Sequence, residues 1–490
     1  MVAVMLLPTH APAEGWRITP RINVRETYSD NINLGVAAAA RSDWVTELSP
    51  GFSLRQTQGG RLKADVDYAL TSLSYAQGAG ADRTANSLRA NASYEAIDRW
   101  LFLDARANVG LQGISAFSAQ PTGLASVTNN QAETRSVEFA PRIEGRLRDA
   151  SYQLRYSATQ TSSDVANFGT AQAQSWTGRI GSAAGLSRLG WSVDFYNRQT
   201  KSEGASAQDQ ARVAATLSYR LVPDLSLYAS LGREKNSAVS TNSNNQGIGS
   251  IGGTWTPNER TSLNLERRKR IFGTGYVGNF SHRQRMMAFN VSYSRDVTDT
   301  ASLLAIPVNP ANLATLDAAL SSTYPDPAIR QNVLMNLLAQ SSLVDTQALT
   351  FGVLTNRVFV DKRWNATVAL NGVRNTLTFT AYRSIREALS NSLIADDFTG
   401  NGTLTQMGAY SSLSHHLSPN TSANLGLRWS KSTGDGPTAQ ELTQRSLLLD
   451  VSTKIGPHSS GNVGVRRVRN DTGGGETREN AVTASFLYSF

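Results

Sequence analysis

The last ten residues, 481–490, read AVTASFLYSF and decide how the whole chain folds. Apolar or small side chains recur at every second position, and the alternation ends on Phe486, Tyr488 and Phe490. A period of two is the period of a β-strand that has one apolar face and one polar face. The stretch therefore predicts a strand whose aromatic side faces an apolar medium.

The same alternation recurs along the chain in segments of about 10 to 14 residues, for example over 15–28, 101–112, 135–148 and 211–221. Strands of soluble proteins average about 5–6 residues, whereas a strand that crosses a membrane needs about 9–11. No run of apolar residues is long enough for a membrane-spanning helix. Long strands with one apolar face predict membrane-spanning strands instead.

The connections between these segments alternate in length, as they do in outer-membrane barrels. Short turns occur at Gln58–Gly60, Asp98–Arg99, Arg148–Asp149, Val222–Asp224, Pro257–Glu259, Ser418–Asn420 and Gly456–His458. Longer polar segments occur at 29–41, 113–133, 162–173, 235–246, 387–402, 433–442 and 470–479. With one tight link at Phe272–Gly275, the connections predict an all-β fold: a transmembrane antiparallel up-and-down barrel of about 22 strands (range 20–24) over residues 14–490.

Such a barrel must pair its last strand with its first, because lipid cannot hydrate an open edge. Phe486, Tyr488 and Phe490 would then face lipid as part of an aromatic girdle. A terminal aromatic residue after alternate apolar positions also resembles the signal that the bacterial outer-membrane assembly machinery reads. We therefore expect that machinery to be a partner of the chain.

Residues 298–356 interrupt the strand pattern. Asp326 followed by Pro327 is typical of a helix start, and apolar residues then follow a helical period. We expect one or two short helices within this insert. The insert could leave the outer rim as a loop, or it could fold into the lumen as a plug.

Residues 1–13 resemble the tail of a secretory signal peptide, with an apolar run and Ala11-Pro12-Ala13 as a cleavage site. The basic beginning of such a peptide is missing, which would fit a truncated start. Export and a barrel together predict integral insertion in the outer membrane of a Gram-negative bacterium. The chain has no cysteine, which excludes disulfides, thiolate metal sites and thiol nucleophiles.

No arrangement of residues predicts catalysis or a bound cofactor. His415 and His416 are neighbours on a strand and point to opposite faces, as do Ser281 and His282. The loop 395–402, ADDFTGNG, could offer oxygen ligands to calcium, but exposed turns use the same residues. We expect no enzyme activity, no metal site and no cofactor.

Arginine is the main charged residue: 40 of the 47 basic residues are Arg, and the net charge is +9. The arginines recur singly along the chain, so we expect no nucleic-acid partner, which would need a concentrated patch. Many of them lie on the polar face of the predicted strands, which would line the lumen. There they could hold the barrel in shape, or they could make the pore favour anions. The predicted lining residues are Arg21, Arg106, Arg142, Arg146, Arg212, Arg268, Arg270 and Arg428.

The densest basic run is LERRKRIFG, residues 265–273. As a strand it sends Glu266, Arg268 and Arg270 to one face and Arg267 and Lys269 to the other. If the first set faces the lumen, the second faces outward near the outer rim, where lipopolysaccharide phosphates could bind it. A simple solvated rim is the equal alternative.

Three stretches together suggest a family: TYSDNINLG (27–35), RRKRIFGTGYVGNFSHRQR (267–285) with VSYSRDVT (291–298), and NRVFVDKRWNATVALNGVRNTLTFTAYRS (356–384). With the final Phe490 they resemble the outer-membrane β-barrel family associated with the PEP-CTERM/exosortase system of Gram-negative bacteria. The resemblance covers residues 16–490. It implies a role beside exopolysaccharide biosynthesis and export, and it assigns no catalytic residue.

Three functions remain in view. The first is a channel or export conduit, with exopolysaccharide and periplasmic export proteins as partners. The second is a general or anion-preferring diffusion porin. The third is a non-conducting surface protein that anchors polymer through its long loops.

Overall fold

The computed structural model describes residues 15–56, 59–121, 123–165, 168–182, 188–239, 245–304, 353–437 and 440–490. The predicted signal peptide, residues 1–13, lies outside the described residues. So does most of the predicted insert 298–356, including Asp326, Pro327 and the helical pattern after them.

The described residues form 22 β-strands of 10 to 16 residues each. The strands are β1 (Trp16–Ser29), β2 (Asp43–Gln56), β3 (Leu62–Tyr75), β4 (Arg83–Ile97), β5 (Leu101–Gly113), β6 (Gln131–Arg146), β7 (Ala150–Ser163), β8 (Thr170–Ser182), β9 (Leu189–Ser202), β10 (Gln208–Val222), β11 (Leu225–Asn236), β12 (Asn245–Asn258), β13 (Thr261–Arg270), β14 (Gly273–Arg283), β15 (Met287–Asp299), β16 (Val358–Asn371), β17 (Asn375–Ala388), β18 (Thr403–His416), β19 (Thr421–Gly434), β20 (Glu441–Lys454), β21 (Ser459–Thr472) and β22 (Gly475–Ser489).

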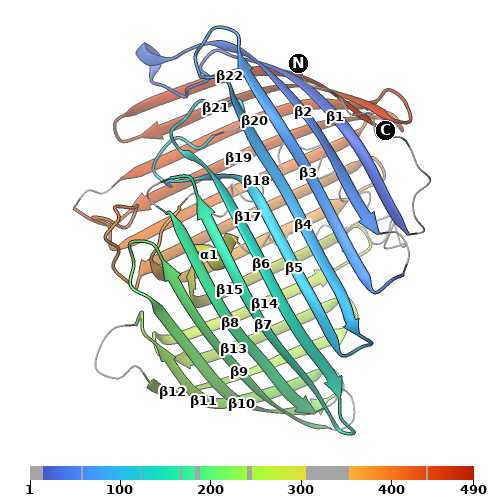
Figure 1. The fold of residues 1–490 in the computed structure, drawn as a ribbon, viewed down its shortest axis with the longest axis vertical. Helices are drawn as coiled ribbons and strands as arrows, with labels where there is room; N and C mark the ends of the chain where they lie inside the picture. The colour runs from blue at the N-terminus through green and yellow to red at the C-terminus, as the bar shows by residue number, and fades with distance from the viewer. Residues whose placement is uncertain are drawn as a thin grey trace.

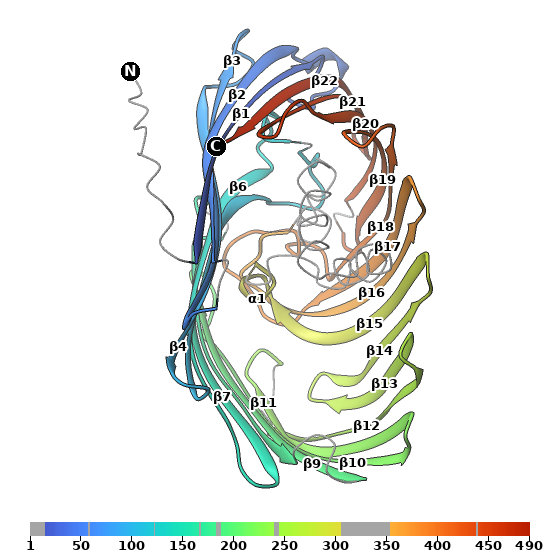
Figure 2. The ribbon, with the colours of Figure 1, turned by 90° about the vertical axis from the view of Figure 1, so that its right-hand side faces the viewer.

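Every strand pairs antiparallel with the next along the chain, and β1 pairs with β22, so the sheet closes into a barrel (Figure 1). In the closing pair Arg21 lies opposite Ser489, and Ser29 lies opposite Ala481. The Ser29 hydroxyl also donates a hydrogen bond to Glu479 (2.8 Å), although 450 positions separate the two residues. The predicted fold and strand number are confirmed, and the ring of strands is elongated in Figure 2.

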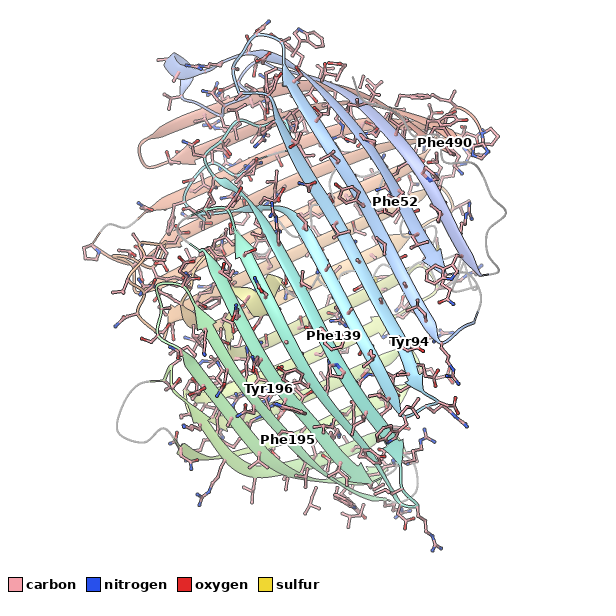
Figure 3. All side chains as sticks on the ribbon, viewed as in Figure 1. Phe52, Tyr94, Phe139, Phe195, Tyr196 and Phe490 are labelled. Carbon is pink, nitrogen blue, oxygen red and sulfur yellow. The ribbon has the colours of Figure 1, made fainter. Side chains whose placement is uncertain are left out.

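The two faces of the wall differ as the alternation predicts. On β22, Val482, Phe486 and Tyr488 are exposed on the outside, whereas Glu479 and Ala481, on the other phase of the same strand, are buried inside. Figure 3 labels Phe52, Tyr94, Phe139 and Phe195, which are exposed aromatic residues of β2, β4, β6 and β9. An apolar outer face on a closed sheet is the surface that a hydrocarbon interior requires.

The near rim is the end of the barrel at Trp16 and Phe490, and the far rim is the end at Ser29 and Gly475. The near rim carries short turns, and the far rim carries the longer connections together with two tight turns, at 271–272 and 473–474. One predicted loop is wrong: the segment 470–479 is strand almost throughout, with only Gly473 and Gly474 outside β21 and β22. Its residues pair up to Thr472 opposite Gly475.

Two short helical segments occur among the described residues, η1 (Ala37–Ala39) and α1 (Thr300–Leu304). Helix α1 lies inside the ring of strands (Figure 2). Asp299 begins it: its carboxylate accepts hydrogen bonds from the backbone N–H (2.7 Å) and hydroxyl (2.9 Å) of Ser302, as an N-cap residue does. In the described part of the chain, no helix has the length and apolarity to cross a membrane.

Candidate functional site

The predicted arginines lie on several sectors of the inner wall. Arg21 of β1 makes two hydrogen bonds to Asp67 of β3, both 2.6 Å long. Arg142 of β6 pairs with Asp104 (3.3 Å) and Glu144 and stacks over Phe102. Arg106 on β5 and Arg146 at the near-rim end of β6 are exposed, and Arg428 lies opposite Tyr410 on β18. These five do not form one site.

The other three, Arg212, Arg268 and Arg270, share one sector on β10 and β13. Arg270 pairs with Glu234 of β11 (2.6 Å) and Asp296 of β15 (3.1 Å). Arg268 pairs with Glu266 (2.9 Å) and Asp296 (3.6 Å), and Arg212 lies opposite Glu234 in the β10–β11 pair. These bonds join strands across the wall, so the network stiffens this side of the barrel.

A polar trough runs beside this network along the inner faces of β8 to β13, with a cavity volume of about 650 Å³. It extends from Arg188, close to the near rim, to Arg270 at the far-rim end of β13. Its hydroxyl-bearing residues include Ser182, Ser192, Thr216, Ser218, Ser226, Ser230 and Ser250. Because these side chains are small, they leave open space between the larger side chains of the lining.

The charge of the trough is mostly positive. The described lining residues include Arg179, Arg188, Arg212, Arg220, Arg268 and Arg270, against the carboxylates Asp194 and Glu266. Arg179 pairs with Asp194 (3.4 Å), but Arg212 and Arg220 make no ion pair among the described contacts. Cations that face water without a carboxylate attract anions. The trough can therefore hold water, sugar hydroxyls and anionic groups.

A second feature packs against the inside of the wall at the far rim. The mouth layer consists of residues 114–121, 123–130, 300–304, 353–357 and 389–402, which lie inside the wall and pack on it. Phe117 and Val353 share a buried apolar cluster with Phe359 and Phe398, and the last two rings stack at 5.9 Å. Ala125 joins a separate cluster with Leu73 of β3. The layer is thus a packed structure with its own apolar core.

Polar contacts fix the mouth layer to the opposite wall. Asn356 donates hydrogen bonds to the carbonyls of Phe168 (2.9 Å) and Glu203 (2.8 Å), which belong to the connections beside β8 and β9. Asp299 pairs with Arg198 of β9 (3.2 Å). Gln444 of β20 donates to the carbonyl of Gln120 (3.1 Å). The layer is therefore attached on both sides of the lumen.

Two neighbouring aspartates join the segments of the mouth layer. The Asp397 carboxylate accepts hydrogen bonds from the Ser115 hydroxyl (2.6 Å) and the Ala116 backbone N–H (2.7 Å). Asp396 accepts from Arg357 (2.9 Å) and from the Thr355 hydroxyl (2.5 Å). Burial raises the pKa of Asp397 to about 6 despite its two hydrogen bonds.

The loop 395–402, weighed above as a calcium site, uses both of its aspartates in these protein contacts. Among the described residues, no three His, Cys, Asp or Glu side chains gather as metal ligands would. His282 hydrogen-bonds Thr261 (2.9 Å), and His415 hydrogen-bonds Asn375 (2.6 Å). These side chains take part in local structure.

The aromatic residues of the last strand lie on the outer face at the near rim. Phe486 is 44% exposed, Tyr488 37% and Phe490 63%. Tyr488 packs edge-on against Phe490 at 4.9 Å, and the backbone N–H of Phe490 donates to the Pro20 carbonyl (2.9 Å). The aromatic row thus extends the closing β1–β22 pair to its end.

The sequence interpretation missed Arg179, Tyr228 and the row of serines in the trough. Apart from Ser182, each lies on the inward phase of its strand, so the alternation could have placed it inside. It missed the contact between Asp397 and Ser115 as well, for which no local pattern gives a signal.

No family model matches the chain, and no curated protein does. Among solved structures, it resembles the siderophore receptor PirA from Acinetobacter baumannii, at 8% identity and a TM-score of 0.50, over 97% of this chain and 80% of that one. It also matches the FrpB iron transporter from Neisseria meningitidis, at 11% identity and a TM-score of 0.48, over 98% and 82% of the two chains. At these identities the likeness to PirA concerns the barrel fold.

Proposed function

We propose that this chain is an integral outer-membrane barrel of a Gram-negative bacterium and a conduit for polar polymer, with exopolysaccharide as its cargo. The near rim then faces the periplasm, where export proteins would meet it, and the far rim faces the cell surface. The trough along β8 to β13 is the proposed path, and the chain performs no catalysis.

The trough carries this proposal, because it runs from rim to rim and presents hydroxyls and arginines. A path lined by small hydroxyls exchanges hydrogen bonds with a hydrated sugar chain without holding it at one point. The apolar outer face supports the membrane location. The resemblance to barrels of the PEP-CTERM/exosortase system supports polysaccharide as the cargo.

Tryptophan substitutions test the path. We expect the pair T216W/S230W, on the trough side of β10 and β11, to lower single-channel conductance in planar bilayers and polymer secretion in cells. The matched pair L217W/L231W changes the neighbouring residues, whose side chains are exposed on the outer face, and should leave both unchanged. Equal effects of the two pairs would exclude the trough as the path.

An anion-preferring diffusion porin is the second candidate, favoured by the excess of arginine over carboxylate in the trough. Under this function R212Q/R220Q should lower the anion-to-cation permeability ratio, whereas R106Q, outside the trough, should not. Normal polymer secretion in a deletion strain, together with anion-selective conductance, would favour the porin over the export conduit.

A non-conducting surface protein is the third candidate, favoured by the packed mouth layer. Under this function the intact barrel should be silent in bilayers and should bind polymer at its far rim. A D397A variant, which removes the contacts to Ser115 and Ala116, should then remain silent as well.

A further inference from the structure

A group of four cations on the outer face has no part in the proposed path. Arg233 and Lys235 lie on β11, Arg267 and Lys269 lie on β13, and all four side chains are exposed. They occupy the far-rim ends of their strands. They alternate with Glu234, Arg268 and Arg270, which face the lumen, so the same alternation that builds the inner network leaves these four outside.

The strand between them carries glycine at two of its outward positions, with Asn245 opposite Lys235 and Ile251 opposite Arg267. Gly247 and Gly249 of β12 lie opposite Arg233 and Leu231 on β11, and Gly249 lies opposite Lys269 on β13. A Cβ atom added at Gly247 would meet nothing within 4 Å. Strands two apart in a sheet are separated by about 9–10 Å. The result is a slot of about that width, with Arg233 and Lys269 on its two sides, glycine backbone as its floor, and Asn245 and Ile251 at its two ends.

Some outer-face cations elsewhere on the barrel have acidic partners. On β19 to β22, Lys431 pairs with Glu441 (2.6 Å) and Arg469 pairs with Glu476 (2.7 Å). Among the described contacts, none of the four slot cations forms an ion pair with a carboxylate. Grouped cations repel one another, so an anion from outside would stabilise this arrangement.

Apolar residues border the slot on its near-rim side. Leu231 is 77% exposed, Ile251 is 66% exposed and Leu265 is 55% exposed, and all three come from the same three strands. The surface therefore changes from cationic to apolar within about two residues along β11 and β13. A ligand that matches it has an anionic head and hydrocarbon chains.

We propose that this slot binds a phosphorylated glycolipid of the outer leaflet, with phosphates between the cations of β11 and β13 and acyl chains along Leu231, Ile251 and Leu265. Arg and Lys make charge-assisted hydrogen bonds to phosphate oxygens. The outward positions of β12 between Arg233 and Lys269 are Gly247 and Gly249, which leaves room for a sugar ring there. The proposal rests on the outer-membrane location, and it is independent of what passes through the lumen.

The test titrates the purified, folded full-length barrel in detergent with bisphosphorylated lipid A, with the same lipid after removal of its phosphates, and with inorganic phosphate. R233Q/K235Q/R267Q/K269Q should weaken binding of the phosphorylated lipid at least about tenfold, the loss expected for one charge-assisted contact. G247E, which places a carboxylate in the slot at an open position, should do the same.

The matched control, R99Q/R148Q/R260Q/R285Q, removes the same charge from near-rim turns and should retain binding within about twofold. Equal loss in the control and the slot variant would overturn the proposal, as would equal binding of the phosphate-free lipid. Displacement of the lipid by inorganic phosphate at equal affinity would also overturn it. Single-channel conductance of the same variants reports separately on the proposed path.

Discussion

Asp397 joins two segments of the mouth layer through a carboxyl group whose pKa burial raises from 3.8 to about 6. Because the folded pKa lies above the ordinary value, the packed arrangement around Asp397 binds a proton more tightly than a state in which this carboxyl is exposed to water. Its stability is therefore greatest below about pH 4 and falls as the pH rises through 6.

We expect the Ala116 amide to be more protected from hydrogen exchange at pH 5 than at pH 7.5, by up to about tenfold after correction for intrinsic rates. D397N should abolish this difference, because the amide does not titrate. A pH dependence that survives in D397N would assign the effect to another group.

Arg270 is the best-paired cation of the inner network, with a side chain only 10% exposed beside a Glu234 side chain only 5% exposed. R270A should lower the free energy of unfolding by about 3–5 kcal/mol, because it leaves the buried Glu234 carboxylate without its arginine partner. Urea denaturation in detergent micelles measures the change. R106A removes an exposed inward arginine and should cost under about 1 kcal/mol; equal losses would show that the network adds no stability.

At the scale of the strand, the two faces of the wall should respond oppositely to charge. V465R places a cation on the outer face halfway along β21 and should destabilise the membrane-inserted barrel by about 2–4 kcal/mol. S485R places the same charge inside, on the neighbouring β22, and should be nearly neutral. Denaturant titration in lipid vesicles measures both, and similar losses would contradict the assignment of the faces.

The strands were predictable from sequence because each crosses one apolar medium, so its alternation is strong. The segment 470–479 was misjudged because β21 and β22 continue there with few apolar side chains on either face. Arg469 and Glu476 stand outside while Asn470 and Glu479 stand inside, so no apolar phase marks the strand. Polarity alone therefore indicated a loop.

The site was less predictable than the fold. The alternation of inward and outward positions placed Arg212, Arg268 and Arg270 on the lumen side. It could not show that the sector around them stays open as a trough. That outcome depends on where the mouth layer packs, which is set by contacts such as Phe359 with Phe398. Those residues are distant in sequence and follow no common period.

At the scale of the whole molecule, the mouth layer should control access to the lumen. The natural chain has no cysteine, so S115C/D397C would contain its only thiols, at two positions whose wild-type side chains are in contact. If polymer or ions pass the layer, conductance should be lower with the disulfide formed and should recover on reduction. The single variant S115C serves as the control, and equal conductance in both redox states would mean that the layer does not move during passage.

The hydrogen bond from Ser29 to Glu479 also indicates the order in which the strand pairs form during folding. Hairpins between consecutive strands join residues close in sequence and can form early, whereas the β1–β22 seam joins residues 450 positions apart. We expect the seam to form last. Until then β1 and β22 are both unpaired edges, so a folding intermediate must be shielded from other chains or it will aggregate through them.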